Sequence, residues 1–221
     1  MKYYQFEDKK QNKLAIGKII CLARTYKKHA EEMKTDVTKE PILFLKPSSS
    51  VIFERETIII PKISKSVHHE VELGVVIGKK GKNIKKKKAM DYILGYALGL
   101  DITARDLQSE AKKKGWPWSI SKGFDTFAPI STVVLKEEIP NPHNLDILLK
   151  VNEEIRQKSN TSFMIYSIEE IVEFISKIMT LEPGDLILTG TPEGVSEIKN
   201  NDMIKAEIGD RLSLSVNVKS E

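Results

Sequence analysis

Two glutamates in the stretch VHHEVELGVV, residues 67–76, are candidate cation ligands. With the period of two that a strand imposes, Glu70 and Glu72 share one face with His68. Same-face neighbours along a strand lie about 7 Å apart, so their charges repel unless water or a cation intervenes. On an exposed strand such a pair usually serves only solubility. A third carboxylate is therefore needed before the pair indicates a site.

Asp101 supplies that carboxylate. It follows the apolar run YALGL directly, and functional groups often gather where a strand ends. Three carboxylates without a nearby cysteine form an oxygen site for a hard divalent cation, with Mg²⁺ expected first, Mn²⁺ second and Ca²⁺ third. His68 is the alternative, as a zinc-type ligand on the same face. His69, on the apolar face, is expected to be a hydrogen-bonded core histidine.

A histidine and a glutamate stand three residues apart in RTYKKHAEEMK, residues 24–34. On a helix His29 and Glu32 can meet, and the spacing alone favours an ordinary surface pair. The functional alternative is a dyad in which Glu32 orients His29 and raises its basicity, so that the imidazole deprotonates a water molecule. Arg24 and Tyr26 precede the pair, which favours a lid segment with several polar side chains.

Two further polar clusters follow along the chain. Arg105, Gln108 and Lys122 come soon after the third carboxylate. The glycine-rich stretch LTGTPEGV, residues 188–195, can direct backbone N–H groups and the Thr191 hydroxyl toward an anion. It lacks the GK[ST] element of a P-loop, so nucleotide binding is not supported.

The elements that must position these groups are mostly strands. Strand-like runs are expected in the following segments: 19–23, 42–52, 56–62, 67–76, 122–135, 144–157, 185–190 and 202–220, the last with a turn at Gly209-Asp210. A helix-to-strand transition is expected around Gly95, and helical composition at residues 24–34. The clearest helix is SIEEIVEFISKIM, with a capping box of Ser167 and Glu170. Its apolar stripe is formed by Ile168, Ile171, Val172, Ile175 and Ile178. Many strands and few helices predict a predominantly β, α+β fold.

The length of 221 residues suits one main domain, expected at residues 19–221, with a small N-terminal appendage at residues 1–18. No apolar run approaches the roughly 20 residues that span a bilayer, so no membrane partner is expected. The N-terminus lacks the apolar core of a signal peptide. The single cysteine cannot form an internal disulfide. A cytoplasmic protein is the expectation.

Positive charge is abundant but diffuse, with a formal net charge of +4. The run GKKGKNIKKKK, residues 78–88, has no interleaved aromatic residue and is expected to be a solvated loop rather than a phosphate-binding patch. A lysine-rich module that binds nucleic acid is the alternative from another functional class, and no nucleic-acid partner is expected.

Several stretches, in this order, resemble the fumarylacetoacetate hydrolase family, particularly its short acylpyruvase-type members. The stretches are GKIICLARTYKKHAEEM, ILFLKPSSSVI, VHHEVELGVVIGK, GYALGLDITARDLQ, KGWPWSISKGFDTFAPIS and LEPGDLILTGTPEGV. The resemblance implies a mixed β-sandwich roll with few short helices around a Mg²⁺ or Mn²⁺ site, usually in a homodimer.

The resemblance also implies roles for particular residues. The family's metal ligands fall on Glu70, Glu72 and Asp101, and the H-x-x-E of its lid helix falls on His29 and Glu32. Its substrate-binding positions fall on Arg24, Tyr26, Arg105, Gln108, Lys122 and Thr191, with Lys122 also suited to stabilising an enolate. The sequence departs from the family pattern at Ala23, Thr25, Leu100 and Asn200-Asn201-Asp202.

The implied activity is metal-dependent hydrolysis of a carbon–carbon bond in an acylpyruvate, such as acetylpyruvate or fumarylpyruvate, through a pyruvate enolate. The expected partner is thus a small 2-oxo acid. Oxaloacetate decarboxylation and tautomerisation use the same electron sink and are the near alternatives. Isomerisation of 2-hydroxyhepta-2,4-diene-1,7-dioate and sugar-acid dehydration are further alternatives within the family.

Overall fold

The structure is a computed structural model that describes residues 1–7, 13–32 and 40–221. The last two positions of the helical segment expected at residues 24–34 lie outside these ranges. Within them, the larger sheet has the strand order β10-β7-β6-β13-β1-β2. Its strands are β10 (Val134–Leu135), β7 (Ile93–Leu100), β6 (Val71–Ile77), β13 (Leu186–Leu188), β1 (Ile19–Ala23) and β2 (Ile42–Lys46). The β1–β13 pair is parallel and the other pairs are antiparallel. The expectation of mixed sheets is therefore confirmed.

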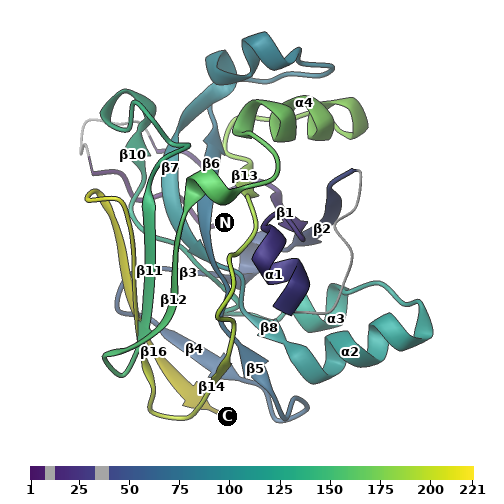
Figure 1. Cartoon of the computed structure of the whole chain (residues 1–221), viewed down its shortest axis with the longest axis vertical. Helices are drawn as coiled ribbons and strands as arrows, with labels where there is room; N and C mark the ends of the chain where they lie inside the picture. The colour runs from purple at the N-terminus through teal and green to yellow at the C-terminus, as the bar shows by residue number, and fades with distance from the viewer. Residues whose placement is uncertain (8–12, 33–39) are drawn as a thin grey trace.

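A second sheet lies beside the first, on the left in Figure 1. Its strands, in order, are β12 (Glu154–Asn160), β11 (Asp146–Val151), β15 (Met203–Ile208), β16 (Leu212–Ser220) and β4 (Thr57–Ile60). Exposed and buried residues alternate along β15 and most of β16, as they do in a sheet with one face on the core. A large apolar cluster joins side chains of both sheets, so the two sheets share a core.

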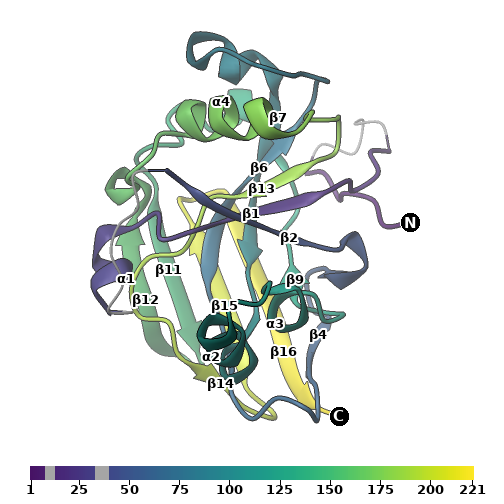
Figure 2. The same ribbon diagram turned by 90° about the vertical axis from the view of Figure 1, so that its right-hand side faces the viewer.

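Short strands and helices surround these sheets (Figures 1 and 2). The short strands are β3 (Val51–Ile52), β5 (Val67–His68), β8 (Thr103–Ala104), β9 (Ala128–Pro129) and β14 (Glu197–Ile198). The α-helices are α1 (Lys27–Glu32), α2 (Arg105–Lys114), α3 (Ser119–Lys122) and α4 (Ile168–Ile178). The 3₁₀ turns are η1 (Ser48–Ser50), η2 (Lys86–Tyr92), η3 (Lys136–Glu138) and η4 (Thr161–Phe163). None of the helices in the described ranges is long and apolar enough to cross a membrane.

Helix α4 has the predicted start. Ser167 and Glu170 form the capping box, and four of the five residues in the expected stripe are buried. Ile178 is the exception, with 54% of its surface exposed at the end of the helix. The stripe therefore packs on the core for about two turns and ends before Ile178.

Three sequence-based expectations were wrong in detail. Residues 67–76 form two strands rather than one, because the chain leaves strand geometry at His69 and Glu70 between β5 and β6. Residues 122–135 contain only β9 and β10, with the end of α3 before them. Residues 144–157 form two strands, β11 and the start of β12, rather than one. The helix-to-strand transition expected around Gly95 is present, since η2 passes into β7 at Ile93.

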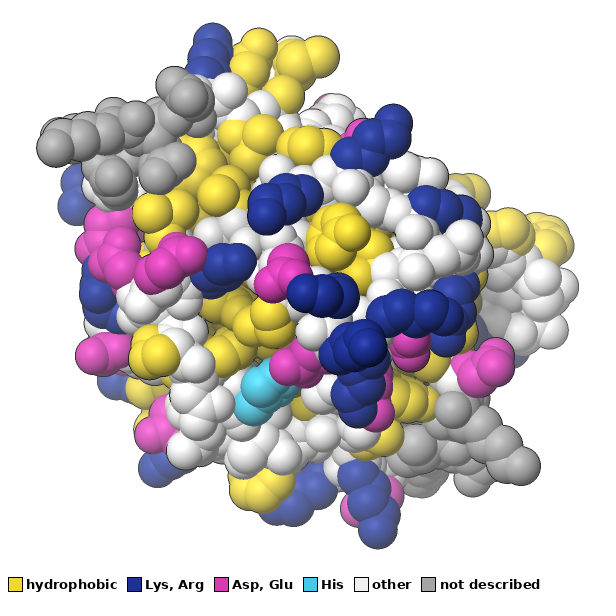
Figure 3. Space-filling view, turned by 90° about the horizontal axis from the view of Figure 1, so that it is seen from above, with side chains coloured by type: hydrophobic (Ala, Val, Ile, Leu, Met, Phe, Trp, Pro, Cys, Tyr) yellow, Lys and Arg dark blue, Asp and Glu magenta, His cyan; other side chains and the backbone are white. Residues whose placement is uncertain are grey.

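The lysine-rich run, residues 78–88, lies in the loop and 3₁₀ turn after β6. Seen from above in Figure 3, lysine and arginine side chains are interleaved with acidic ones. Lys80 lies 2.9 Å from Glu182, and Lys86 lies 2.8 Å from Glu170. This interleaving fits the expectation of a solvated surface segment. The division into residues 1–18 and 19–221 stays a prediction.

Candidate active site

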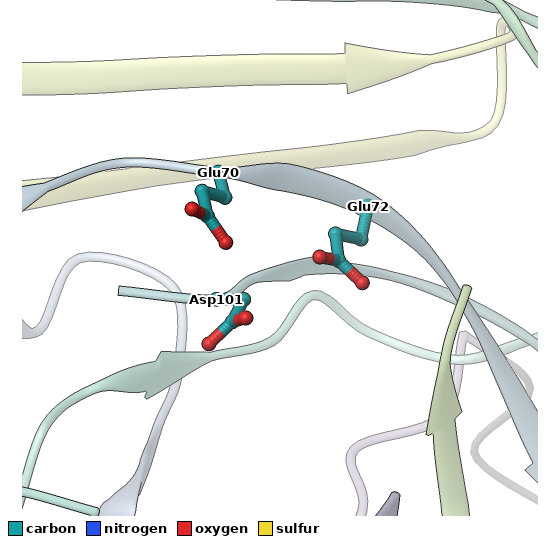
Figure 4. Close-up of side chains that lie close together, drawn as sticks. All are labelled: Glu70, Glu72 and Asp101. Atoms are coloured by element: carbon teal, nitrogen blue, oxygen red, sulfur yellow. The ribbon is translucent and has the colours of Figure 1, made fainter. Parts of the chain in front are cut away.

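The three predicted carboxylates converge where β6 and β7 pair (Figure 4). Glu70 and Glu72 flank the first residue of β6, and Asp101 follows β7. The Asp101 N–H donates to the Glu70 carbonyl oxygen at 2.8 Å, which fixes the two strand ends relative to each other. One carboxylate oxygen from each residue lies within 4.8 Å of the others. Three hard oxygen donors at this separation fit a divalent cation such as Mg²⁺ or Mn²⁺.

The carboxylates are buried rather than solvated. Glu70, Glu72 and Asp101 are 5%, 1% and 0% exposed, so their charges need partners inside the protein. Lys122 supplies one. Its Nζ donates to Glu70 Oε2 at 2.9 Å, and it also forms an ion pair with Asp101. A second buried lysine, Lys46 at the end of β2, places Nζ 2.8 Å from Asp101 Oδ1. Positive charge therefore compensates the cluster from two sides.

Sequence reasoning missed Lys46. The residue ends an apolar strand before a proline, and that context gave no sign that its ammonium turns inward. The fully buried ammonium also donates to the backbone carbonyl oxygens of Ile102 at 2.9 Å and Lys122 at 2.6 Å. Lys46 thus connects β2, α3 and the strand end at Asp101.

The two glutamates carry opposite pKa shifts. Burial by itself raises the pKa of Glu70, but the charges of Lys122 and Arg105 outweigh it and hold the pKa well below its usual range. Burial and the neighbouring Asp101 and Glu70 carboxylates raise the pKa of Glu72. Glu72 Oε2 also accepts a hydrogen bond from the Gly190 N–H at 2.6 Å. The site therefore combines an ionised glutamate with one that retains its proton more readily.

Helix α2 brings two predicted substrate-binding residues to the cluster. Arg105 forms an ion pair with Glu70, and its Nη1 donates to Gln108 Oε1 at 2.7 Å. The helix itself was missed, because its sequence RDLQSEAKKK has no apolar stripe. Gln108 and Ala111 are its buried residues. Its C-terminal signal was present in the sequence, since Gly115 follows three lysines and adopts the left-handed conformation, with φ of 68°.

The predicted dyad is formed on α1. His29 Nδ1 lies 3.4 Å from Glu32 Oε2, and His29 is 8% exposed. The same glutamate accepts from the Gly194 N–H at 3.1 Å, so the glycine-rich loop holds the carboxylate in place. Burial lowers the pKa of His29 despite the nearby carboxylates. The imidazole is therefore neutral near pH 7 and able to accept a proton.

His68 and His69 lie in different surroundings. His68 lies on β5, where its Nε2 is 3.0 Å from Ser66 Oγ, and the described acidic cluster contains only carboxylates. The structure thus gives no support to the zinc-type alternative. His69 is fully buried and bonded on both ring nitrogens, by Gln157 Oε1 and Ser196 Oγ at 2.9 Å each. The expectation of a hydrogen-bonded core histidine is confirmed.

Gln157 is a buried residue that sequence reasoning missed. Its Oε1 accepts from His69 and from the Val71 N–H at 3.1 Å, and its Nε2 donates to Thr191 Oγ1 at 2.8 Å and to Pro192 O at 2.9 Å. Val71 N–H is only a donor and Pro192 O only an acceptor, which fixes the orientation of the amide. His69 must then donate from Nδ1. No local pattern marks a strand glutamine as the partner of a distant loop.

The segment between β1 and α1 contacts the glycine-rich loop. Arg24 has a φ of 61°, a conformation that non-glycine residues rarely adopt. Next to it, Thr25 Oγ1 donates to the Thr189 carbonyl oxygen at 2.8 Å. Gly190, with φ of 96°, comes so close that a Cβ there would lie 1.8 Å from Thr25 Oγ1. Thr25, one of the positions that departs from the family pattern, therefore fixes the glycine-rich loop by a hydrogen bond.

These groups surround a cavity of about 40 Å³. Its lining residues are Leu22, Ala23, Arg24, His29, Phe44, Glu70, Glu72, Arg105, Gln108, Lys112, Trp118, Lys122 and Thr191. Eight of the predicted site residues are among them. Asp101, Glu32 and Tyr26 are not: Asp101 pairs with the lining residue Lys122, Glu32 contacts the lining residue His29, and Tyr26 is 1% exposed in the core. Phe44, Lys112 and Trp118 were not predicted, although the WPW cluster is unusual for a surface turn.

Comparisons with known proteins show which family this chain belongs to. The family model "Fumarylacetoacetate (FAA) hydrolase C-terminal" matches residues 18–219. The chain is 52% identical over 201 residues to "Oxaloacetate tautomerase FAHD1, mitochondrial" of Mus musculus, covering 91% of each chain. It is 50% identical over 192 residues to "Oxaloacetate decarboxylase, mitochondrial" of Dictyostelium discoideum, covering 86% of this chain and 88% of the relative.

A solved structure shows the same fold. Fumarylpyruvate hydrolase from Pseudomonas aeruginosa, in complex with Mn²⁺ and pyruvate, superposes with a TM-score of 0.95 and 35% identity, covering 99% of this chain and 96% of that one. The family match and the relatives each span most of the sequence. The chain belongs to the fumarylacetoacetate hydrolase family of enzymes.

Proposed function

We propose that this protein is a divalent-metal-dependent enzyme that interconverts the keto and enol forms of oxaloacetate. The observation that carries the proposal is the buried carboxylate cluster, which opens onto a cavity of only about 40 Å³ with a basic lining. A cavity lined by basic side chains, with carboxylates that could hold a cation, suits a small anionic substrate. The relatives that are 52% and 50% identical, whose names specify oxaloacetate tautomerase and decarboxylase, support the same substrate.

Glu70, Glu72 and Asp101 are the residues that would hold the cation, and we propose Mg²⁺ or Mn²⁺. A cation bound there supplies a Lewis acid for the 2-oxo group of the substrate. The Mn²⁺ in the solved fumarylpyruvate hydrolase supports this assignment. Because a ligand must be deprotonated to bind a metal, Glu72 would lose its proton when the cation enters.

Two side chains at the cavity can stabilise the enolate and transfer the proton. Burial lowers the pKa of Lys122, but the Asp101 and Glu70 carboxylates outweigh it and raise the pKa, so the ammonium stays protonated and can donate a hydrogen bond to an enolate oxygen. Neutral His29 can take a proton from C3 of oxaloacetate, with Glu32 holding the ring. The enolate oxygen then gains a proton, delivered from the protonated His29 directly or through solvent, so the base is regenerated and the keto and enol forms carry the same number of protons.

Hydrolysis of an acylpyruvate is the second candidate function. The His29–Glu32 pair favours it, because the same base could take a proton from water instead of from C3. Attack of that water on the distal carbonyl would release pyruvate as its enolate, beside Lys122. The similarity to fumarylpyruvate hydrolase supports this reaction, although at a lower identity of 35%.

We further propose a homodimer in the cytoplasm, without nucleic acid or membrane as a partner. The interleaved charges of the lysine-rich surface support the lack of a nucleic-acid partner. Light scattering on the purified protein would measure the mass: twice 25.0 kDa supports the dimer, and 25.0 kDa contradicts it.

The experiment is an assay of purified protein with Mg²⁺ or Mn²⁺, and with EDTA, on oxaloacetate, acetylpyruvate and fumarylpyruvate. The enol absorbance of oxaloacetate reports tautomerisation, and pyruvate release reports decarboxylation or hydrolysis. Metal-dependent loss of the enol is expected. Glu70→Gln should abolish it and weaken Mn²⁺ binding in calorimetry. Turnover of none of the three substrates would overturn the proposal, and retained Mn²⁺ affinity in the variant would overturn the ligand assignment.

A further inference from the structure

Helix α2 presents one polar stripe to the cavity. Arg105, Gln108 and Lys112 stand at positions i, i+3 and i+7, which share a helix face, and all three line the cavity. The adjacent lysines do not line it. Lys113 is exposed, and Lys114 lies 2.6 Å from Glu110 in a surface ion pair. Of the three consecutive lysines, Lys112 alone borders the cavity.

The positively charged side chains deeper in the site already pair with carboxylates. Arg105 pairs with Glu70, and Lys122 pairs with Glu70 and Asp101. Within the described ranges, Lys112 has no ion pair. Its Nζ lies 5.1 Å from the ring centroid of Trp118, a cation–π distance that holds the ammonium near the cavity. Of these three side chains, only Lys112 is without a carboxylate partner among the described residues.

The surroundings of Lys112 also favour an anion. Partial burial, followed by repulsion from Arg105, lowers its pKa to about 8. Glu70 opposes this shift, and Arg24 and Lys122 add to it. An ammonium with positive neighbours gains more from an incoming carboxylate than one on an open surface does, because the carboxylate relieves the repulsion. Much of Lys112 is still exposed, which places it at the mouth of the cavity.

A 2-oxo dicarboxylic acid has a carboxylate at each end. In the proposed function, the 2-oxo group would meet the cation held by Glu70, Glu72 and Asp101, so the carboxylate next to it would lie at the same end of the cavity and the other would point away. We propose that Lys112 binds this distal carboxylate, and that the stripe on α2 selects dicarboxylic over monocarboxylic 2-oxo acids. The inference rests on the proposed function and adds to it a residue that determines specificity.

Lys112→Met tests the inference, with Lys113→Met as the matched control one residue away. Methionine keeps most of the alkyl stem and removes the charge. We expect Lys112→Met to raise KM for oxaloacetate roughly tenfold, with kcat changed less than twofold, since an exposed charge contact is partly screened. Lys113→Met should leave both constants within twofold of wild type. Lys112→Arg keeps the charge and should restore most of the affinity.

Two ligands without a distal carboxylate separate this role from a general effect of charge. Oxalate is too short to extend beyond the metal ligands, and acetylpyruvate ends in a methyl ketone. The Kd of oxalate, measured by calorimetry with Mg²⁺, and the KM of acetylpyruvate should change less than twofold in Lys112→Met. Comparable losses for all three ligands, or an unchanged oxaloacetate KM, would overturn the assignment while leaving the proposed function intact. Lack of oxaloacetate turnover by the wild type would overturn both.

Discussion

Gln157 Nε2 donates a hydrogen bond to Thr191 Oγ1 at 2.8 Å, and so joins the outer hairpin of one sheet to the glycine-rich loop of the site. Thr191 Oγ1 in turn donates to the Val71 carbonyl oxygen at 2.9 Å, between the two glutamates. The position of a cavity-lining hydroxyl is thus set by a side chain that lies outside the cavity.

Gln157→Leu should destabilise the protein by on the order of 3 kcal/mol, because it leaves several buried polar groups without partners. The KM for substrate should also rise, since Thr191 loses a contact that fixes it. Urea unfolding and steady-state kinetics measure the two effects. Gln157→Glu retains acceptor oxygens for Val71 but cannot donate to Pro192 O, so it should fall between wild type and Gln157→Leu. Wild-type stability in both variants would contradict this account.

Gly190→Ala should damage the site through the backbone. A Cβ at this position would lie 1.8 Å from Thr25 Oγ1, and the φ of 96° is unfavourable for alanine. We expect a loss of on the order of 2 kcal/mol in unfolding free energy and weaker Mn²⁺ binding, because the Gly190 N–H also contacts Glu72. Gly115→Ala is a control with a left-handed φ of 68° but no atom within 4 Å. It should lose stability but keep Mn²⁺ affinity, and equal Mn²⁺ binding in both variants would refute the role of the close approach.

His29→Gln should separate the reactions of the site. Tautomerisation and hydrolysis both need a base, so their kcat should fall by about 10²- to 10⁴-fold. Decarboxylation of oxaloacetate releases CO₂ without removal of a proton from carbon, so any such activity should persist. Enol absorbance, pyruvate release from acetylpyruvate and CO₂ release are measured on the same preparation. A uniform loss of all three would show that His29 acts through structure or binding rather than as a base.

The affinity for oxaloacetate should depend on pH above neutrality. The pKa of Lys112 is lowered to about 8, so the ammonium is charged below pH 8 and loses its charge as the pH rises through that value. The KM for oxaloacetate should therefore increase between pH 7 and 9. Lys112→Arg should flatten this increase, because a guanidinium stays charged throughout the range. The same slope in both proteins would assign the titration to another group.

Much of the site could be predicted because its residues occur in local patterns. Alternation placed Glu70 and Glu72 on one face, and the end of an apolar run placed Asp101 near them. His29 and Glu32 meet by helix spacing alone. The strand pattern also indicated a mainly β fold, although the break between β5 and β6 did not show, because His69 and Glu70 continue the alternation.

The residues that were missed depend on contacts distant in sequence. Gln157 donates a hydrogen bond to Thr191, which is 34 residues away in the sequence. Lys46 donates one to the carbonyl oxygen of Ile102, which is 56 residues away. Helix α2 has no apolar stripe because its inward face is partly the polar lining of the cavity. Hydrophobic periodicity cannot report a helix whose buried face is used for binding.

Lys122 and Lys46 neutralise negative charge in the carboxylate cluster from within the chain. Together with Arg105 they place three positive groups against Glu70 and Asp101, so the chain supplies counter-ions for two of the three carboxylates. In a zinc finger, by contrast, the ligands gather only when metal arrives, and folding depends on loading. Here internal ion pairs already join the ends of β2, β7 and α3, so we expect this part of the chain to fold without a bound cation.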